Sequence, residues 1–258
     1  MQSIHRAAGL PIAIPALIAI AWVLAALAQF SGSAAFLHHD ALIEHGPPAA
    51  IALPLFILAW LVMIAAMMLP SSLPLLGMFA YASANQPRPK AAFAAFVGGY
   101  AVVWTAFGIT AFAGDVLVHR TVDRVAWLSA HPWAIAGTVL AVAGAFQFTP
   151  LKDACLRTCR LPGNFLMHHY RRGLRAAFEL GYRHGLFCAG CCWALMLIGF
   201  AAGFASLWWM AALTAVMVYE KTARRGRAAV PIAGAVLLLW SALVFAHPWW
   251  LPPAFSGI

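Results

Sequence analysis

The chain has 258 residues, of which 64% are apolar and only 9% are charged, and its formal net charge is +9. Soluble domains are roughly 45 to 50% apolar and about 25% charged, so this balance excludes a soluble protein and indicates an integral membrane protein. No soluble domain or low-complexity linker interrupts the apolar pattern. We therefore expect one integral membrane domain over residues 1–258.

Seven apolar segments, most of them close to the ~20 residues that cross a bilayer as a helix, predict an all-α, polytopic transmembrane helix bundle. The segments are 11–30, 49–69, 91–114, 132–151, 184–204, 206–219 and 229–246. The first also resembles a signal peptide, and its removal would leave six spans. Because its apolar run of about 20 residues exceeds the usual 7 to 15 of such a peptide, we expect a retained helix.

The basic residues predict the orientation. If the N-terminus is cytoplasmic, every Lys and Arg except Arg120 and Arg124 lies on the cytoplasmic side, as the positive-inside rule requires. The predicted topology is N-in and C-out. Orientation and anionic head groups then account for the positive charge, so the expected partner is the lipid bilayer and not a nucleic acid.

One basic cytoplasmic loop, residues 152–183, is long enough to hold structure of its own. Apolar and small residues recur there at helical spacing, which favours a helix lying on the membrane surface. They are Leu166, Tyr170, Leu174, Ala177, Phe178 and Gly181, with Arg171, Arg172 and Arg175 on the other side. An irregular basic loop is the alternative.

All five cysteines are expected near the cytoplasmic interface. They are Cys155, Cys159, Cys188, Cys191 and Cys192. Cys155 and Cys159 are four residues apart and share a face if the fourth span continues as a helix past Pro150. The other three stand at i, i+3 and i+4 in the first turns of the fifth span, also on one face.

Methionines accompany the cysteines at the same depth. Met63 and Met67 share one face of the second span just before Met68, where the prolines at 70 and 74 are expected to interrupt the helix. Met196 lies one turn beyond Cys192. For any single Cys or Met, plain core packing is the usual explanation, but three thiols within five residues on one face favour a chemical role.

The donor set favours a soft metal ion. Cytoplasmic thiols stay reduced, and cysteines four apart on a helix are poorly placed for a bridge, so disulfides are not expected. Thiolates and thioethers together select Cu(I), while thiolates alone also suit zinc. Cys188, Cys191 and Cys192 supply enough ligands for copper(I). A tetrahedral zinc site would need a fourth, Cys155 or Cys159.

Glu220 and Lys221 close the sixth span, where a carboxylate is costly unless it is paired or hydrated. Ordinary snorkelling of both side chains to the interface is one explanation. The other is functional, because metal binding releases protons from cysteine ligands and Glu220 could accept one or line the exit.

The outer face carries histidines and carboxylates without any cysteine. These residues are His38, His39, Asp40, Glu44, His45, Asp115, His119, Asp123, His131 and His247. For His38, His39, Asp40, Glu44 and His45, solvated loop residues are the simpler explanation, and capture of a divalent ion is the other. Imidazoles outside and thiols inside motivate a transport hypothesis.

Four short motifs carry a resemblance to a known family. They are MMLPS at 67–71, TPLK at 149–152 followed by Cys155 and Cys159, CAGCCW at 188–193, and the Glu220-Lys221 pair. Over roughly residues 50 to 250 the sequence resembles a bacterial family of unknown function whose members are labelled predicted metal-binding integral membrane proteins. The resemblance implies the bacterial inner membrane. It also implies the motif positions Gln147, Thr149, Lys152, Cys155, Cys159, Cys188, Cys191, Cys192 and Glu220.

The leading hypothesis is a metal-handling protein that transports copper(I) or delivers it to a metallochaperone or membrane partner. The predicted ligands are the five cysteines with Met63, Met67, Met68, Met196 and Glu220, supported by Gln147, Thr149, Lys152 and Lys221. A membrane thiol-disulfide oxidoreductase and a non-catalytic assembly subunit are the alternatives. Hydrolase and kinase motifs are absent from the sequence, so transport or delivery is favoured over catalysis.

Overall fold

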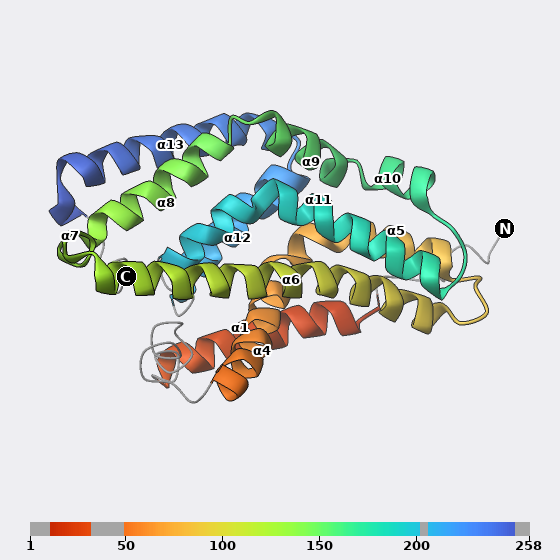
Figure 1. Cartoon of the computed structure of the whole chain (residues 1–258). Helices are drawn as coiled ribbons and strands as arrows, with labels where there is room; N and C mark the ends of the chain where they lie inside the picture. The colour runs from red at the N-terminus through yellow and green to blue at the C-terminus, as the bar shows by residue number, and fades with distance from the viewer. Residues whose placement is uncertain (1–10, 32–48, 202–205, 251–258) are drawn as a thin grey trace.

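The computed structural model describes residues 11–31, 49–201 and 206–250. Within these ranges the chain forms eleven α-helices and one short 3-10 turn and contains no β-strand. The predicted all-α class is therefore confirmed. Figure 1 shows the long helix α6 running through the middle of the molecule, with α11 beside it and with α8 and α13 paired at one end.

The helices are α1 (Ala13–Phe30), α4 (Ala49–Met67), α5 (Leu69–Ser83), α6 (Pro89–Arg124), α7 (Ala126–Ala130), α8 (Pro132–Phe146), α9 (Pro150–Arg160), α10 (Pro162–His169), α11 (Leu174–Ala201), α12 (Leu207–Thr222) and α13 (Gly226–Ala246), followed by the turn η1 (Pro248–Trp250).

Three helices, α1, α6 and α13, are long and apolar enough to cross a membrane. Two further candidates are bent pairs: residues 51–67 of α4 with α5, and α8 with α9. The described chain therefore offers three spans, or up to five if each bent pair is one span. The seven predicted spans and their N-in orientation remain predictions.

Both bent pairs break at a motif that the sequence singled out. Between α4 and α5 the chain turns by 72° at Met68, and Pro70 lies at the start of α5. The expected interruption at Pro70 is confirmed, whereas Pro74 lies inside α5 and does not break it. Between α8 and α9 the turn is 64°, so the fourth span does not continue as one helix past Pro150. Thr149 caps the new helix by accepting a hydrogen bond from the Lys152 amide at 3.2 Å.

Helices α6 and α11 form the most extensive helix pair of the fold. Gly99 of α6 lies directly against the backbone carbonyl of Phe178, and Gly181 of α11 lies against that of Phe96. A Cβ at either glycine would overlap a backbone oxygen, so the two helices approach as closely as they do because both positions lack a side chain. This contact fixes α11, and hence its cysteines, against α6.

Two indole hydrogen bonds position α4. The Trp60 Nε1 donates to the Trp104 carbonyl of α6 at 2.7 Å, and the Trp22 Nε1 of α1 donates to the Ala66 carbonyl at 3.0 Å. Because Trp60 and Ala66 lie on either side of Met63, these bonds hold the methionine-bearing end of α4 against the rest of the fold.

The basic segment 152–183 is mostly helical. It contains most of α9, all of α10 and the first turns of α11. The apolar positions predicted for one surface helix are divided between α10 and α11, which a turn at Gly173 separates. Gly173 has a φ of +108°, a conformation that favours glycine, and its amide donates to the Gln86 Oε1 at 3.1 Å.

Candidate metal centre

Four of the five cysteines gather where α9 meets α11. Cys188, Cys191 and Cys192 are fully buried on α11, and the Cys159 Sγ of α9 lies 4.0 Å from the Cys191 Sγ. Cys155 lies one turn before Cys159 and packs on α11 at Gly190, where an added Cβ would stand 2.7 Å from its Sγ. The two cysteines share a face because both lie in α9, although the continuous fourth span on which that prediction depended is not formed. All five are free thiols.

Two of the buried thiols are engaged by their own helix. The Sγ atoms of Cys191 and Cys192 lie 3.1 Å and 2.9 Å from the Cys188 carbonyl oxygen, to which each donates a hydrogen bond. Within residues 11–31, 49–201 and 206–250, no three His, Cys, Asp or Glu side chains stand at metal-binding spacing. To converge on one ion, these thiols would have to rotate away from the carbonyl, a change of side-chain rotamer on an unchanged helix.

Lys221 reaches the cysteines from α12. Its side chain is 5% exposed, and its Nζ lies 3.1 Å from the Cys188 Sγ and 3.1 Å from the Ser71 Oγ. A thiolate is the form of cysteine that binds metals, and a neighbouring ammonium stabilises it. Lys221 was predicted only as a supporting residue, and the structure gives it direct contact with a candidate ligand.

A second polar group completes the surroundings of Cys188, and the sequence interpretation missed it. The Tyr100 hydroxyl lies 3.2 Å from the Cys188 Sγ and 3.5 Å from the Ser72 Oγ. The His184 Nε2 lies 3.1 Å from the same Ser72 oxygen. Tyr100, Ser72 and His184 are buried polar residues within apolar segments, and that pattern was the signal available in the sequence.

Two cations contact Glu220, one at its side chain and one at its backbone carbonyl. The Lys152 Nζ of α9 and the Glu220 Oε2 of α12 form an ion pair at 2.6 Å, with side chains that are 1% and 2% exposed. Arg160 donates to the Glu220 carbonyl oxygen, and at 2.8 Å to that of Ala223. The second carboxylate oxygen of Glu220 is buried without a hydrogen-bond partner. The structure thus joins Glu220 to Lys152, and its predicted role as a ligand or proton acceptor remains a prediction.

Gln147, the remaining motif residue, lies at the break between α8 and α9. It is 4% exposed, and neither atom of its side-chain amide has a hydrogen-bond partner. No hydrogen bond among the described residues therefore supports the predicted role of Gln147.

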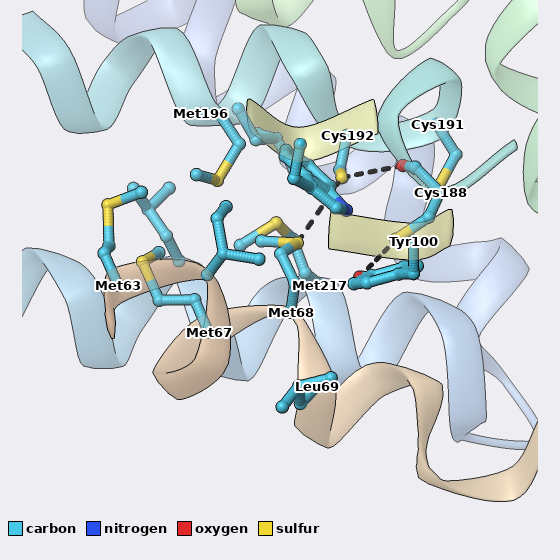
Figure 2. Close-up of a cluster of buried hydrophobic side chains, with 14 of the residues drawn as sticks. Met63, Met67, Met68, Leu69, Tyr100, Cys188, Cys191, Cys192, Met196 and Met217 are labelled. Carbon is cyan, nitrogen blue, oxygen red and sulfur yellow. Dashed lines mark hydrogen bonds between the residues drawn. The ribbon is translucent and has the colours of Figure 1, made fainter. Parts of the chain in front are cut away.

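The predicted methionines lie beside the cysteines. Met63, Met67, Met68 and Met196 are buried, and the Cys192 Sγ lies 3.7 Å from the Met68 Sδ. Figure 2 shows Met68 and Met217 between Cys192 on one side and Met63, Met67 and Met196 on the other. Met217 of α12 is fully buried and belongs to the same core, although it was not among the predicted ligands.

The outer-face residues that the structure describes form no such cluster. His119 and Asp115 face each other at 4.0 Å, His131 bonds to the Trp127 carbonyl at 2.7 Å, and His247 packs on Trp249. Asp123 is exposed in the last turn of α6. The remaining predicted group, His38, His39, Asp40, Glu44 and His45, lies outside the described residues.

Fold and site together define a helical protein with membrane-length helices packed around a buried set of thiols, thioethers and cations. Residues 57–244 match the family model described as PpoB2, copper chaperone, and the matched range contains every motif position from Met67 to Lys221. The match covers most of the chain, so the protein belongs to this copper chaperone family. No curated protein and no solved structure matches it.

Proposed function

We propose that this protein binds copper as Cu(I) at Cys159, Cys188, Cys191 and Cys192 and passes it to a partner protein or across the membrane. The proposal rests above all on the meeting of thiols from α9 and α11 next to the Lys221 ammonium. Membership of a copper chaperone family supports the choice of metal.

Coordination chemistry favours Cu(I) over zinc at this position. Cu(I) is satisfied by two or three soft ligands, which the α11 cysteines supply with Cys159 close by. A structural zinc site is tetrahedral and closed, so Cys159 or Cys155 would have to serve as a fourth ligand. The adjoining thioether of Met68 also suits copper, because zinc sites in proteins use Cys, His and carboxylate ligands.

We place the protein in the bacterial inner membrane with seven spans, N-in and C-out, and the site near the cytoplasmic end of α11. The distribution of Lys and Arg supports this topology. A cytoplasmic metallochaperone is then a suitable exchange partner, because Cys159 is the one partly exposed thiol of the four.

The direct test is metal analysis of purified protein after incubation with Cu(I) or Zn(II) and a competing chelator. We expect the wild type to retain copper, and a variant with Cys188, Cys191 and Cys192 changed to serine to lose it. A Met210→Leu variant, altered in a buried methionine of α12, is the control and should retain copper. Wild-type protein that remains metal-free, or a serine variant that binds as well as wild type, would contradict the proposal.

Removal of the Lys221 charge should weaken copper binding. We expect Lys221→Met to lower Cu(I) affinity by about 10- to 100-fold, the usual effect of removing a group that supports a metal ligand. Lys221→Arg keeps the charge and should lose less. Competition titration with a Cu(I) chelator measures both variants, and equal affinities for Lys221→Met and wild type would show that the ammonium does not support the site.

Thiol-disulfide exchange is the second candidate, because the Cys159 and Cys191 sulfurs are only 4.0 Å apart on different helices. A mild oxidant would join Cys159 and Cys191 if they form a redox couple, and a mixed disulfide with a partner should be trapped after Cys191→Ser. Thiols that stay free under all redox conditions would count against this function.

A further inference from the structure

A second group of sulfur atoms lies one helical turn from the cysteine site. It consists of the side chains of Met63, Met67, Met196 and Met217, called here the methionine group, and all four are at most 5% exposed. With Met68, five of the nine methionines of the chain meet in this part of the core. Figure 2 shows their thioethers on the side of Met68 and Cys192 that faces away from Cys191.

Three helices contribute to the methionine group. On α11, Met196 follows Cys192 by four residues, and on α12, Met217 precedes Lys221 by four residues. On α4, Met63 and Met67 precede Met68, which touches Cys192. Four residues of α-helix rise about 6 Å, so α11 and α12 each place a thioether about one turn from a residue of the cysteine site. The α4 methionines lead up to Met68, the residue in contact with Cys192.

Plain packing does not require this composition. Leucine has nearly the same volume and would fill a helix core with fewer rotatable bonds, whereas thioether sulfur is a soft, uncharged metal ligand. A thioether binds metal without losing a proton, in contrast to a cysteine thiol. An all-thioether site is therefore chemically different from the thiol site beside it.

From this arrangement we infer that the methionine group is a second Cu(I) site, which exchanges copper with the cysteine site through Cys192 and Met68. The inference rests on the proposed function. The Cys192–Met68 contact at 3.7 Å supplies the connection, because an ion held by Cys192 is already next to the first thioether. Copper stays in the Cu(I) state, thiolate–copper bonds are exchanged for thioether–copper bonds, and the released thiolate takes up a proton.

Copper stoichiometry tests this inference with variants that preserve core volume, since protein cores tolerate exchanges of Met for Leu well. We expect wild type to bind about two Cu(I) ions per chain, and the variant with all four methionines changed to leucine to bind about one, tightly. Met67→Leu/Met196→Leu is the milder variant and should also lose the weaker ion. Met78→Leu/Met210→Leu is the control and should lose none.

Selenomethionine-labelled protein gives an independent measurement. Loaded with Cu(I), it should show selenium–copper scattering at the selenium absorption edge, and the four-leucine variant should show much less. Equal copper binding by wild type and both Met→Leu variants, with no selenium–copper signal, would overturn the second site while leaving the cysteine site intact. Without a competing chelator, the cysteine-to-serine variant should still bind about one Cu(I) ion weakly at the methionine group. Loss of all copper under that condition would contradict the inference, whereas loss of copper only to the chelator is the result expected for the cysteine site.

Discussion

Replacement of Glu220 by leucine is expected to destabilise the protein by about 3 to 5 kcal/mol, because it leaves Lys152 buried without a counter-charge. The two side chains are 1% and 2% exposed and meet at 2.6 Å, so water cannot compensate the lysine. The free energy of unfolding, followed by tryptophan fluorescence during denaturation in detergent micelles, measures the effect. Lys152 also lies one turn before Leu156 on α9, so loss of this contact should disturb the helix that carries Cys155 and Cys159.

Two control variants separate this effect from a general loss of charge. The double variant Lys152→Met/Glu220→Leu removes both charges and should recover most of the lost stability, since buried ion pairs are often replaced by apolar residues at little cost. Arg227→Gln breaks the exposed pair with Asp153 at 2.9 Å and should change stability by no more than about 1 kcal/mol. A Glu220→Leu variant that is as stable as wild type would show that Lys152 finds another partner.

Alanine at Gly181 is expected to have the second large effect. Its Cβ would overlap the Phe96 carbonyl oxygen of α6, and a backbone atom cannot move aside as a side chain can. Overpacking by a methyl group typically costs about 1 to 3 kcal/mol. Because α11 must shift, the 3.2 Å contact between Tyr100 and Cys188 should open as well, and Cu(I) affinity should fall together with stability.

Gly98→Ala is the matched control for this substitution. Gly98 precedes Gly99 on α6, and a Cβ there would meet no atom within 4 Å. Alanine is favoured over glycine in a helix by about 1 kcal/mol, so this variant should be as stable as wild type or slightly more stable. Denaturation and Cu(I) competition measured on both variants provide the comparison, and a Gly181→Ala protein that matches Gly98→Ala in both would contradict the close packing of α6 and α11.

Periodicity and composition were sufficient to predict the helical class and the grouping of thiols on α11. Cys188, Cys191 and Cys192 stand at spacings that place them on one side of any α-helix, so their proximity does not depend on the tertiary fold. The helix break at Pro70 could also be predicted from the sequence, because proline cannot donate the required backbone hydrogen bond. These features are local in the sequence.

Contacts between distant segments could not be predicted in the same way. The approach of Cys159 to Cys191 depends on the 64° bend between α8 and α9, and a Thr-Pro pair in the sequence does not specify the angle of a bend. The partners of Lys221 and Glu220 likewise depend on where α12 ends relative to α9 and α11. Sequence indicated that both residues were unusual, but Ser71 and Tyr100 became visible as parts of the site only when the helices were assembled.

The position of Lys221 has a consequence for the electrical balance of a loaded site. Two thiolates and one Cu(I) ion carry a single negative charge, and the ammonium 3.1 Å from the Cys188 Sγ offsets it. An unbalanced charge in a medium of low dielectric constant is costly, so the apolar helix bundle tolerates an electroneutral site best and should hold Cu(I) more weakly at the uncharged thioethers. If the protein binds Cu(I) in a membrane as proposed, a membrane voltage would do little work on the bound ion, and loading and release would follow the concentrations of copper and protons.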